Sequence, residues 1–473
     1  MPDASASPAD IAASKPIVSS DAPGADPAPA ARASQAIPPE VVRRTLAASI
    51  KDGVAASVMS GLAGGYIGPF VILGGSGLIQ LAALSALPGV AAAVVQCFAA
   101  EVTDSVGRRR AIVVLSAVGQ ALAMLPVCVA IFFRFEICYW IMLAGYVLYV
   151  GLPNFGIPAW QSLMGDLVPA DRRGGYFGLR NALCGGVYTA TFLIAGWWLV
   201  LCGKEEGFAL LGLSGRNFGF LVLFGLAGVA RCVSAWYLSR MHDVPYTPHP
   251  RDRFTLLDFV RRAPRAHFGR FVLYLTLVHV GYGFMGPFYG WYLLDQCQFT
   301  TGVYANVLVV GMAIGVFTHA LWGRLADRVG NKRVITICGI GAIFFPVLLL
   351  FCRTPWHFAA VQFYDGVMTA GFAIATGNYI FDVVSPPKRA RCVAYYTLFI
   401  TVGITLGAFP GALVAKYVPM PLALGPLSIT HAFQLLLVGS VILRLLANVL
   451  LLGSFQEFRL SRPVFVAEGA QAS

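Results

Sequence analysis

Two ionisable residues lie inside long apolar stretches of the sequence and could load and release a proton. Asp365 stands in the segment VQFYDGVMTAG, and His279 stands in LYLTLVHVGYGF. A carboxylate inside a membrane span costs roughly 2.5–3.5 kcal/mol on insertion scales, so it normally faces a cavity or a partner. Burial also disfavours its charged form, which is the condition for reversible proton loading. We predict that Asp365 and His279 form a proton-coupling pair; the alternative is a structural hydrogen bond for each.

Two short charged segments share a second pattern of residue types. They read EVTDSVGRRR from Glu101 to Arg110 and GRLADRVGNKR from Gly323 to Arg333. In each, an Asp is followed three residues later by a Gly and then by basic residues. A carboxylate at a helix end is stabilised by the N-terminus of a facing helix, by about 1–2 kcal/mol when partly buried.

Motifs of enzymes and cofactor sites are missing from the sequence. It has no phosphate-binding GxxxxGK[ST] loop, no HExxH zinc motif and no GxSxG nucleophile motif. Its His and Met residues do not cluster at metal-ligand spacing. We therefore expect a protein that is not an enzyme and that holds no metal and no cofactor.

The composition indicates the elements that must position these groups. Apolar residues make up 58% of the 473 residues and charged residues only 12%, and the mean hydropathy is +0.72. A soluble domain of this size needs far more polar surface. The apolar runs are continuous rather than alternating, which favours transmembrane helices over a β-barrel. We predict an all-α membrane protein.

The apolar runs predict twelve membrane spans in two groups of six. The predicted spans are 49–73, 78–100, 111–133, 137–164, 175–201 and 217–239, then 270–294, 302–324, 333–352, 357–382, 392–415 and 430–453. The corresponding domains are a disordered tail at 1–45, a six-helix bundle at 46–240, a cytoplasmic loop at 241–269, a second bundle at 270–455 and a cytoplasmic tail at 456–473.

The basic residues predict the orientation of these spans. Of the 34 Lys and Arg residues, 27 fall on one side of this topology, 5 on the other and 2 within spans. An excess of this size marks the cytoplasmic side, so both termini are expected there. It also accounts for the net charge of +12 without a nucleic-acid partner. The preference for Arg over Lys suggests a bacterial inner membrane. We expect the two span residues, Arg231 and Arg444, to extend toward the cytoplasmic surface, and Asp52 to lie near that interface.

The two halves of the chain repeat the same landmarks in the same order. The charged segments lie between the second and third helices of each half, and a shorter basic segment lies between the fourth and fifth. An Arg stands in the last helix of each half. The matching pairs are Asp104 and Asp327, Gly107 and Gly330, Arg109 and Lys332, Pro169 and Pro386, Arg172 and Arg389, and Arg231 and Arg444. The order indicates a duplicated six-helix unit.

This pattern resembles the major facilitator superfamily, whose hallmark is Gly-x-x-x-Asp-x-x-Gly-Arg-(Arg/Lys) between helices two and three, with a weaker copy between eight and nine. Two positions depart from the hallmark: Ala100 replaces its first Gly, and Asn331 replaces the first Arg of the second copy. The resemblance covers residues 45–455 and implies a gate built from Asp104, Gly107, Arg108, Arg109, Asp327, Gly330 and Lys332. In that fold Asp104 faces the start of helix eleven and Asp327 the start of helix five. The alternative is that these segments only hold their loops in the cytoplasm by charge.

The resemblance also implies a central cavity lined by helices one, four, seven and ten. The polar residues of those helices are then candidates for substrate binding: Tyr66, Tyr149, Asn154, Gln161, Tyr274, His279, Tyr282, Tyr364 and Asn378. Two further residues near the cytoplasmic end, Arg180 and His319, are candidates for contact with an anionic substrate. For each aromatic residue the alternative is ordinary packing.

The function that the resemblance implies is secondary active transport of a small organic solute by alternating access. Protons are the expected coupling ion, symport the expected mode, and the expected partners are the solute and the lipid bilayer around a monomer. Three alternatives remain open: an uncoupled facilitator, an exporter, and a non-transporting assembly or sensor protein with the same fold. Helix five has no Gly-Pro pair, which disfavours a drug exporter.

Overall fold

The computed structural model describes residues 38–168, 173–203, 212–243, 256–384, 389–424, 427–429 and 431–456. Within these residues, twelve helices are long and apolar enough to cross a membrane, which agrees with the predicted number. The predicted tail at 1–45 lies outside the described residues up to 37, as does the predicted tail at 456–473 beyond Gln456. The predicted central loop is described only at 241–243 and 256–269.

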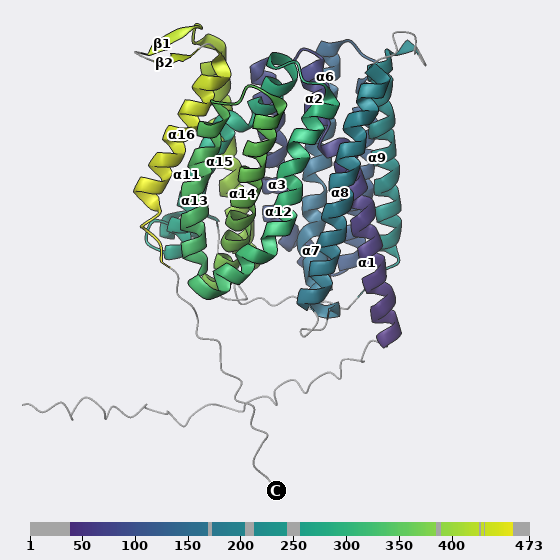
Figure 1. The fold of residues 1–473 in the computed structure, drawn as a ribbon. Coiled ribbons are helices and arrows are strands. Elements are labelled where there is room, and N and C mark those ends of the chain that lie inside the picture. Colours follow the sequence, from purple (N-terminus) through teal and green to yellow (C-terminus); the bar gives the residue numbers. More distant parts are fainter. Residues whose placement is uncertain are drawn as a thin grey trace, which may run out of the picture.

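The first six spans form one group of helices, shown in purple to teal in Figure 1. Several spans are interrupted: the first passes through a π-helical turn, and the third and fourth each consist of two helices. In chain order the elements are α1 (Pro39–Met59), η1 (Ser60–Gly64) and α2 (Ile67–Leu73), then α3 (Leu78–Val106), α4 (Arg109–Leu122), α5 (Met124–Ala130), α6 (Phe135–Gly151), α7 (Pro153–Leu167), α8 (Arg173–Gly203) and α9 (Gly215–Ser239).

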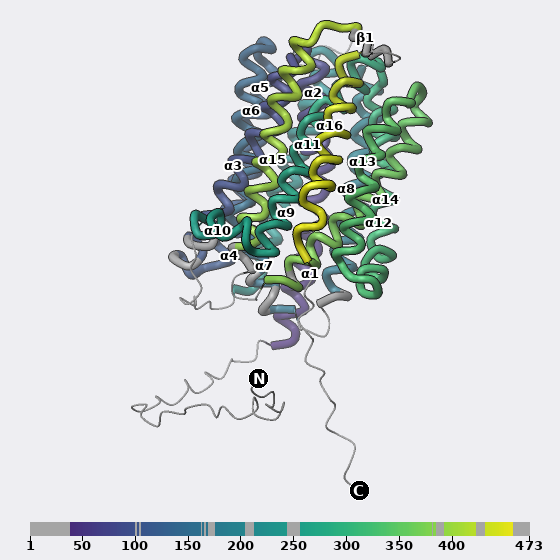
Figure 2. The backbone as a smooth tube through the Cα atoms, turned by 90° about the vertical axis from the view of Figure 1, so that its left-hand side faces the viewer, coloured from purple at the N-terminus to yellow at the C-terminus, as the bar shows by residue number. Residues whose placement is uncertain are grey.

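The second six spans form the other group, shown in green to yellow, and Figure 2 shows the same molecule turned by a quarter. Helix α10 (Leu256–Arg262) precedes this group. It is followed by α11 (His267–Trp291), η5 (Tyr292–Gln296), α12 (Thr301–Val329), α13 (Asn331–Leu349), α14 (Pro355–Val383), α15 (Arg389–Tyr417) and α16 (Ala432–Leu451). Strands β1 (Leu422–Leu424) and β2 (Leu427–Ile429) pair antiparallel between α15 and α16.

The structure corrects two of the predicted boundaries. Helix α1 begins at Pro39, so residues 39–45, which were predicted to belong to the disordered tail, are helical. Proline is well suited to the first turn of a helix, and Glu40 forms ion pairs with Arg43 and Arg44 one turn later. The second bundle begins at His267 rather than at residue 270, and the region predicted as a central loop contains α10.

The two halves share one apolar core at one end of the molecule and have separate cores at the other. The shared core joins Tyr66 and Phe192 of the first half to Phe288 and Tyr304 of the second. Toward the end where α1 begins and α16 ends, which we call the basic end, one core contains residues of the second half and another contains residues of the first. The halves therefore share a core at one end and have their own cores at the other, although α3 of the first half still packs against α15 of the second and its Cys97 contacts the second half's core there.

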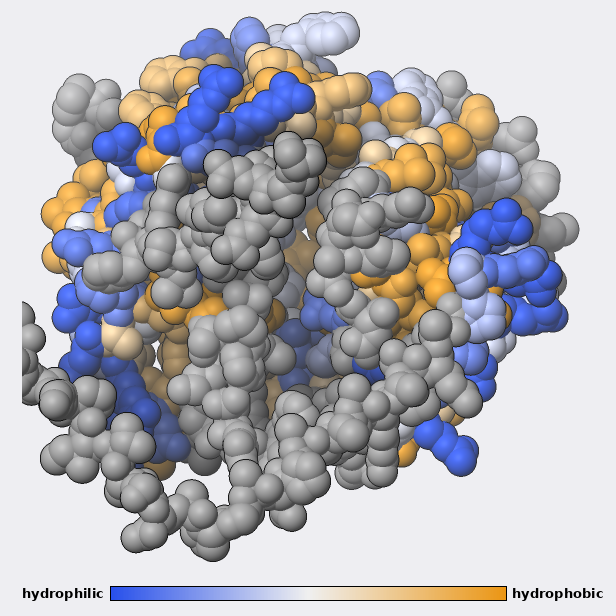
Figure 3. All heavy atoms as spheres, turned by 90° about the horizontal axis from the view of Figure 1, so that it is seen from below, coloured by the Kyte–Doolittle hydropathy of each residue, from blue (hydrophilic) through white to orange (hydrophobic). Residues whose placement is uncertain are grey.

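Helices α8 and α12 show where this separation begins. Near the joined end, a Cβ atom built at Gly196 would lie 2.5 Å from the Cβ of Ala305, so the two helices touch backbone to backbone. Farther along, a Cβ at Gly185 would lie 3.6 Å from Val316. Beyond that point Leu183 and Phe317 are exposed. Figure 3 looks onto the basic end, where hydrophilic side chains lie around the edge and hydrophobic ones are visible deeper between them.

Glycines let α15 pack closely on α11 inside the second half. A Cβ at Gly403 would lie 2.4 Å from the backbone oxygen of Thr276, and one at Gly407 would lie 2.1 Å from that of Val280. Real Cβ atoms do not approach backbone oxygen so closely, so any side chain here pushes the two helices apart.

This packing predicts that Gly407→Leu lowers the melting temperature of the purified protein. Overpacking of a tight contact costs about 1–3 kcal/mol. The control is Gly377→Leu in α14, where an added Cβ meets no atom within 4 Å. The measurement is thermal unfolding in detergent. Equal effects of the two substitutions would contradict the close helix contact.

Candidate functional site

The second half holds a partly buried polar cluster around Asp365 of α14. We call it the Asp365 cluster, formed by His279, Tyr282, Asp365, Thr369 and Arg444. Arg444 is fully buried, Thr369 is exposed, and the other three side chains are half-buried. The rings of Tyr282 and His279 are 5.7 Å apart. The cluster therefore brings together Asp365, His279 and Tyr282, three of the residues predicted from sequence.

Arg444 of α16 supplies the positive charge of the Asp365 cluster. Its side chain is fully buried, and its guanidinium carbon lies 3.9 Å from the centre of the Tyr282 ring. It donates one hydrogen bond, from Nη1 to the Ala342 oxygen at 2.6 Å. A buried guanidinium carries five N–H donors, and Nε and Nη2 of Arg444 have no hydrogen-bond partner among the described residues.

The Asp365 carboxyl group is incompletely satisfied as well. Its Oδ1 atom is buried and lacks a hydrogen-bond partner within the described part of the chain. A buried polar atom without a partner costs about 1–3 kcal/mol, and a charged one costs more. The cluster thus keeps a carboxyl group and a guanidinium near each other with unused acceptors and donors on both. Such a carboxyl group can change its protonation state with a modest change in its surroundings.

His279 binds the backbone of its own helix. Its Nδ1 atom lies 2.7 Å from the backbone oxygen of Leu275. This contact leaves Nε2 for exchange of a proton or for another partner. The geometry matches the alternative of a backbone hydrogen bond and also keeps His279 beside Tyr282.

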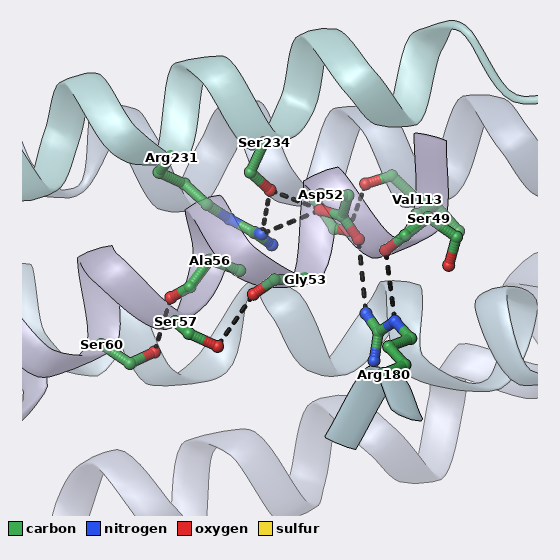
Figure 4. Close-up of polar contacts among 11 residues, drawn as sticks. Ser49, Asp52, Gly53, Ala56, Ser57, Ser60, Val113, Arg180, Arg231 and Ser234 are labelled. Carbon is green, nitrogen blue, oxygen red and sulfur yellow. Dashed lines mark hydrogen bonds and ion pairs between the residues drawn. The ribbon is translucent and has the colours of Figure 1, made fainter. Parts of the chain in front are cut away.

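The first half holds a second buried cluster, around Asp52 of α1, shown in Figure 4. We call it the Asp52 cluster: Ser49, Asp52, Arg180, Arg231 and Ser234. Ser234 donates to Asp52 Oδ1 at 2.6 Å, and Arg231 Nη1 donates to Ser234 at 2.7 Å. Arg231 Nη1 lies 3.9 Å from Asp52 Oδ1, and Arg180 Nη2 lies 3.6 Å from Oδ2. The cluster ties α1, α8 and α9 together.

The structure corrects the sequence interpretation of two charged residues. Arg231 is only 9% exposed and Arg444 is fully buried, so neither side chain extends to the membrane surface as expected. Asp52, which was predicted to lie near the cytoplasmic interface, is packed inside the protein at 4% exposure. Each arginine packs inward, against a carboxylate or an aromatic ring of its own half. The recurrence of an Arg in the last helix of both halves was the signal that could have revealed this.

The other predicted substrate-binding residues are not gathered in one place. Tyr66 and Tyr274 are fully buried; Tyr66 donates to the Phe192 oxygen at 2.6 Å, and Tyr274 to Asn448 at 3.2 Å. Tyr364 donates to the Gly341 oxygen at 2.8 Å. These three tyrosines stabilise helix contacts within their own half.

The remaining predicted residues are nearer to polar neighbours or to the surface. Tyr149 is buried with its ring stacked on Tyr146, and the Asn154 side chain donates to the Val150 oxygen at 2.7 Å. Gln161 and Asn378 are exposed. They lie in the parts of α7 and α14 nearer the basic end, where the halves are separate.

The predicted gate residue Lys332, and Arg110 next to the predicted gate of the first half, bind the ends of the last helices. Arg110 donates from Nη1 to the Met241 oxygen at 3.2 Å, just after α9. Lys332 donates to the Leu452 oxygen, just after α16, and its Nζ lies 3.2 Å from the centre of the Phe455 ring. The basic residues of both repeats thus hold the segment that follows the last helix of their own half.

The other gate residues lie at the ends of the helices that they join. Gly107 and Gly330 have φ values of 65° and 98°, a backbone conformation that favours glycine. Arg109 is fully buried, whereas Arg108 and Asp327 are exposed. The side chain of Asp104 lies outside the described residues, so its expected contact with helix eleven remains a prediction.

Sequence comparisons agree with the repeat pattern. Residues 271–453 match the family model of the Major Facilitator Superfamily. Solute carrier family 22 member 16 of Xenopus laevis is 23% identical over 127 residues, 27% of this chain and 22% of that protein. Multidrug resistance protein MdtG of Serratia proteamaculans is 23% identical over 279 residues, 56% of this chain and 62% of that protein. The matches thus span less than two thirds of either relative.

Solved structures extend the likeness to both halves. A structure of a variant of the nucleoside transporter NupG is similar over 86% of this chain and 100% of that chain, with a TM-score of 0.65 and 13% identity. At this low identity the likeness shows a shared fold.

The Asp52 cluster predicts a strong coupling between Asp52 and Arg231. Arg231→Met leaves the buried Asp52 with less compensation and is expected to cost about 3–5 kcal/mol of stability. Adding Asp52→Asn removes the carboxylate charge and is expected to restore most of the loss. Thermal or denaturant unfolding of the single and double variants measures the coupling, and Arg216→Met, in an exposed part of the same helix, is the control. Strictly additive effects would contradict the interaction.

Proposed function

Because this chain belongs to the major facilitator superfamily, we propose that it carries a small organic solute across a membrane by alternating access, driven by a proton gradient. The observation on which the proposal rests is the Asp365 cluster. It places a carboxyl group, a guanidinium and an imidazole in the interior of an otherwise apolar helix bundle. Charged groups at such positions in membrane proteins are costly and typically serve ion or substrate pathways.

The arrangement of the cores supports alternating access. Two halves that share a core at one end and part between α8 and α12 toward the other correspond to one of two states, with the solute pathway open to the basic end. Rocking the halves about the shared layer would close the basic end and open the other. The small contact residues Gly196 and Ala305 suit such a movement, because they carry no long side chains that must separate.

The charge balance of the Asp365 cluster supports proton coupling. With Asp365 ionised, its negative charge is offset by the positive charge of Arg444 in the same cluster. With Asp365 protonated, Arg444 loses this balance, and the cluster favours a different arrangement or an anionic neighbour. Protonation is thereby linked to the positions of α11, α14 and α16. Tyr282 lies near the carboxyl group and His279 lies beside Tyr282, so the two can serve as a route or relay for the proton.

The orientation and location are part of the same proposal. The basic end carries most of the Lys and Arg residues, so we place it and both termini in the cytoplasm. We place the protein in a bacterial inner membrane, as a monomer. Similar proteins are named for different solutes, drugs in one case and nucleosides in another, so their names support transport rather than one substrate.

The proposal predicts that Asp365→Asn abolishes accumulation driven by a pH gradient and leaves equilibrative exchange in place. The amide cannot take up and release the proton, while the pathway for the solute is unchanged. The measurement is uptake and counterflow of radiolabelled solutes in proteoliposomes with and without a pH gradient. Asp295→Asn, in an exposed position at the opposite end, is the control.

Two outcomes separate this proposal from the alternatives. Accumulation by the unaltered protein that is independent of the pH gradient would identify an uncoupled facilitator. Movement of no solute in either assay would contradict transport and would favour an assembly or sensor protein.

A further inference from the structure

We infer that the solute carries a carboxylate or a comparable acid group, and that Arg180 of α8 receives it. This inference rests on the proposed function and names the class of substrate. Its basis is a surplus of positive charge and of hydrogen-bond donors in the Asp52 cluster, close to the point where the two halves part.

Five charged side chains lie in the interior of the described spans, away from the helix ends. They are Asp52, Arg180, Arg231, Asp365 and Arg444. Arg444 balances Asp365 in the second half, but in the first half two guanidinium groups share one carboxylate. An unbalanced charge in a low-dielectric setting is costly. An anionic solute would balance it during each transport cycle.

Asp52 interacts mainly with Ser234 and Arg231 rather than with Arg180. Its Oδ1 accepts a short hydrogen bond from Ser234 and faces Arg231. Arg180 Nη2 approaches Oδ2 only to 3.6 Å, beyond the usual length of a charged hydrogen bond. Arg180 Nε donates to the Ser49 oxygen at 3.2 Å. In Figure 4 the other terminal nitrogen of Arg180 points away from Asp52.

The donors of the Asp52 cluster also outnumber its acceptors. Arg231 Nε and the Ser49 hydroxyl are buried and have no hydrogen-bond partner among the described residues. Both belong to side chains that are at least nine-tenths buried, with Arg231 at 9% and Ser49 at 0% exposure. An acid group brings several acceptor lone pairs and one negative charge, which is what this cluster lacks.

Arg180 is placed where a solute from the basic end can reach it. It lies five residues beyond Gly185, where α8 makes its contact with Val316, which is about 7.5 Å along the helix. Its side chain is 16% exposed, and its guanidinium lies 4.5 Å from the centre of the Trp160 ring. Stacking on an aromatic ring fixes the plane of a guanidinium and presents its fork to a carboxylate. Gln161, the residue after Trp160 in the chain, is exposed.

Thermal stability of the full-length purified protein tests the inference. The probes are acetate, benzoate, succinate and citrate, each compared with its amide at the same ionic strength. Carboxylates, and not amides, are expected to raise the melting temperature. Arg180→Gln is expected to weaken the effective affinity by about tenfold or more. Arg180→Lys keeps the positive charge but loses the two-pronged donor geometry of the guanidinium. Its affinity for carboxylates is expected to lie between those of the unaltered protein and of Arg180→Gln.

A matched control and a reverse variant exclude a purely structural effect. Arg240→Gln removes another guanidinium that lies over a tryptophan, 4.7 Å from the ring of Trp236, without a neighbouring buried carboxylate, and should leave the response unchanged. Asp52→Asn removes the competing carboxylate and should tighten anion binding severalfold. If Arg180→Gln does not fold, the response of the Asp52→Asn variant to carboxylates still tests the inference.

The inference is overturned if the amides stabilise the protein as well as the carboxylates do, if no carboxylate stabilises it, or if Arg180→Gln or Asp52→Asn leaves the response unaltered. Counterflow in proteoliposomes separates this failure from that of the proposed function. Transport of neutral solutes alone would overturn the anionic substrate and leave the transporter. Binding of carboxylates without any transport would overturn the proposed transport function and leave the carboxylate site in place.

Discussion

The burial of charge inside apolar helix bundles is the constraint on which the rest of this structure depends. Arg231 and Arg444 stand in the last helix of each half, and both are buried. Removing a guanidinium from water is expensive unless an opposite charge, an aromatic face or a carbonyl replaces the solvent. Each half meets this demand with its own helices, so the buried charges tie the helices of each bundle to one another.

The two halves compensate their buried charges in different ways. In the first half Asp52 is held by a hydroxyl and two arginines. In the second, Asp365 keeps an oxygen without a partner while Arg444 lies against Tyr282. Asp52 lies in the first span of its half and Asp365 in the fourth span of its half, so the two carboxylates do not occupy equivalent positions of the repeat. In the mechanism that we propose, the tightly paired carboxylate holds the frame that presents Arg180, and the loosely paired one gains and loses a proton.

Much of the fold could be predicted because the relevant signals are local in the sequence. Apolar run length and the positions of Lys and Arg predict the spans, and the recurring Asp-x-x-Gly pattern predicts the duplication. Asp365 stood out because it interrupts a long apolar run.

What could not be predicted is how each helix is rotated about its axis. An Arg eight residues from a helix end can reach the surface or turn inward, and Arg231 turns inward because Asp52 and Ser234 face it from the neighbouring helix and its own. The same uncertainty applied to Tyr66, Tyr274 and Tyr364, whose hydroxyl groups find backbone or amide partners within their bundle.

The basic residues that follow Gly107 and Gly330 hold the segments just beyond α9 and α16. Those segments lead, respectively, into the stretch that joins the two halves and into the C-terminal end of the chain. A displacement of either stretch is therefore transmitted to the turn between the second and third spans of that half, because a basic residue of that turn binds the segment where the stretch begins.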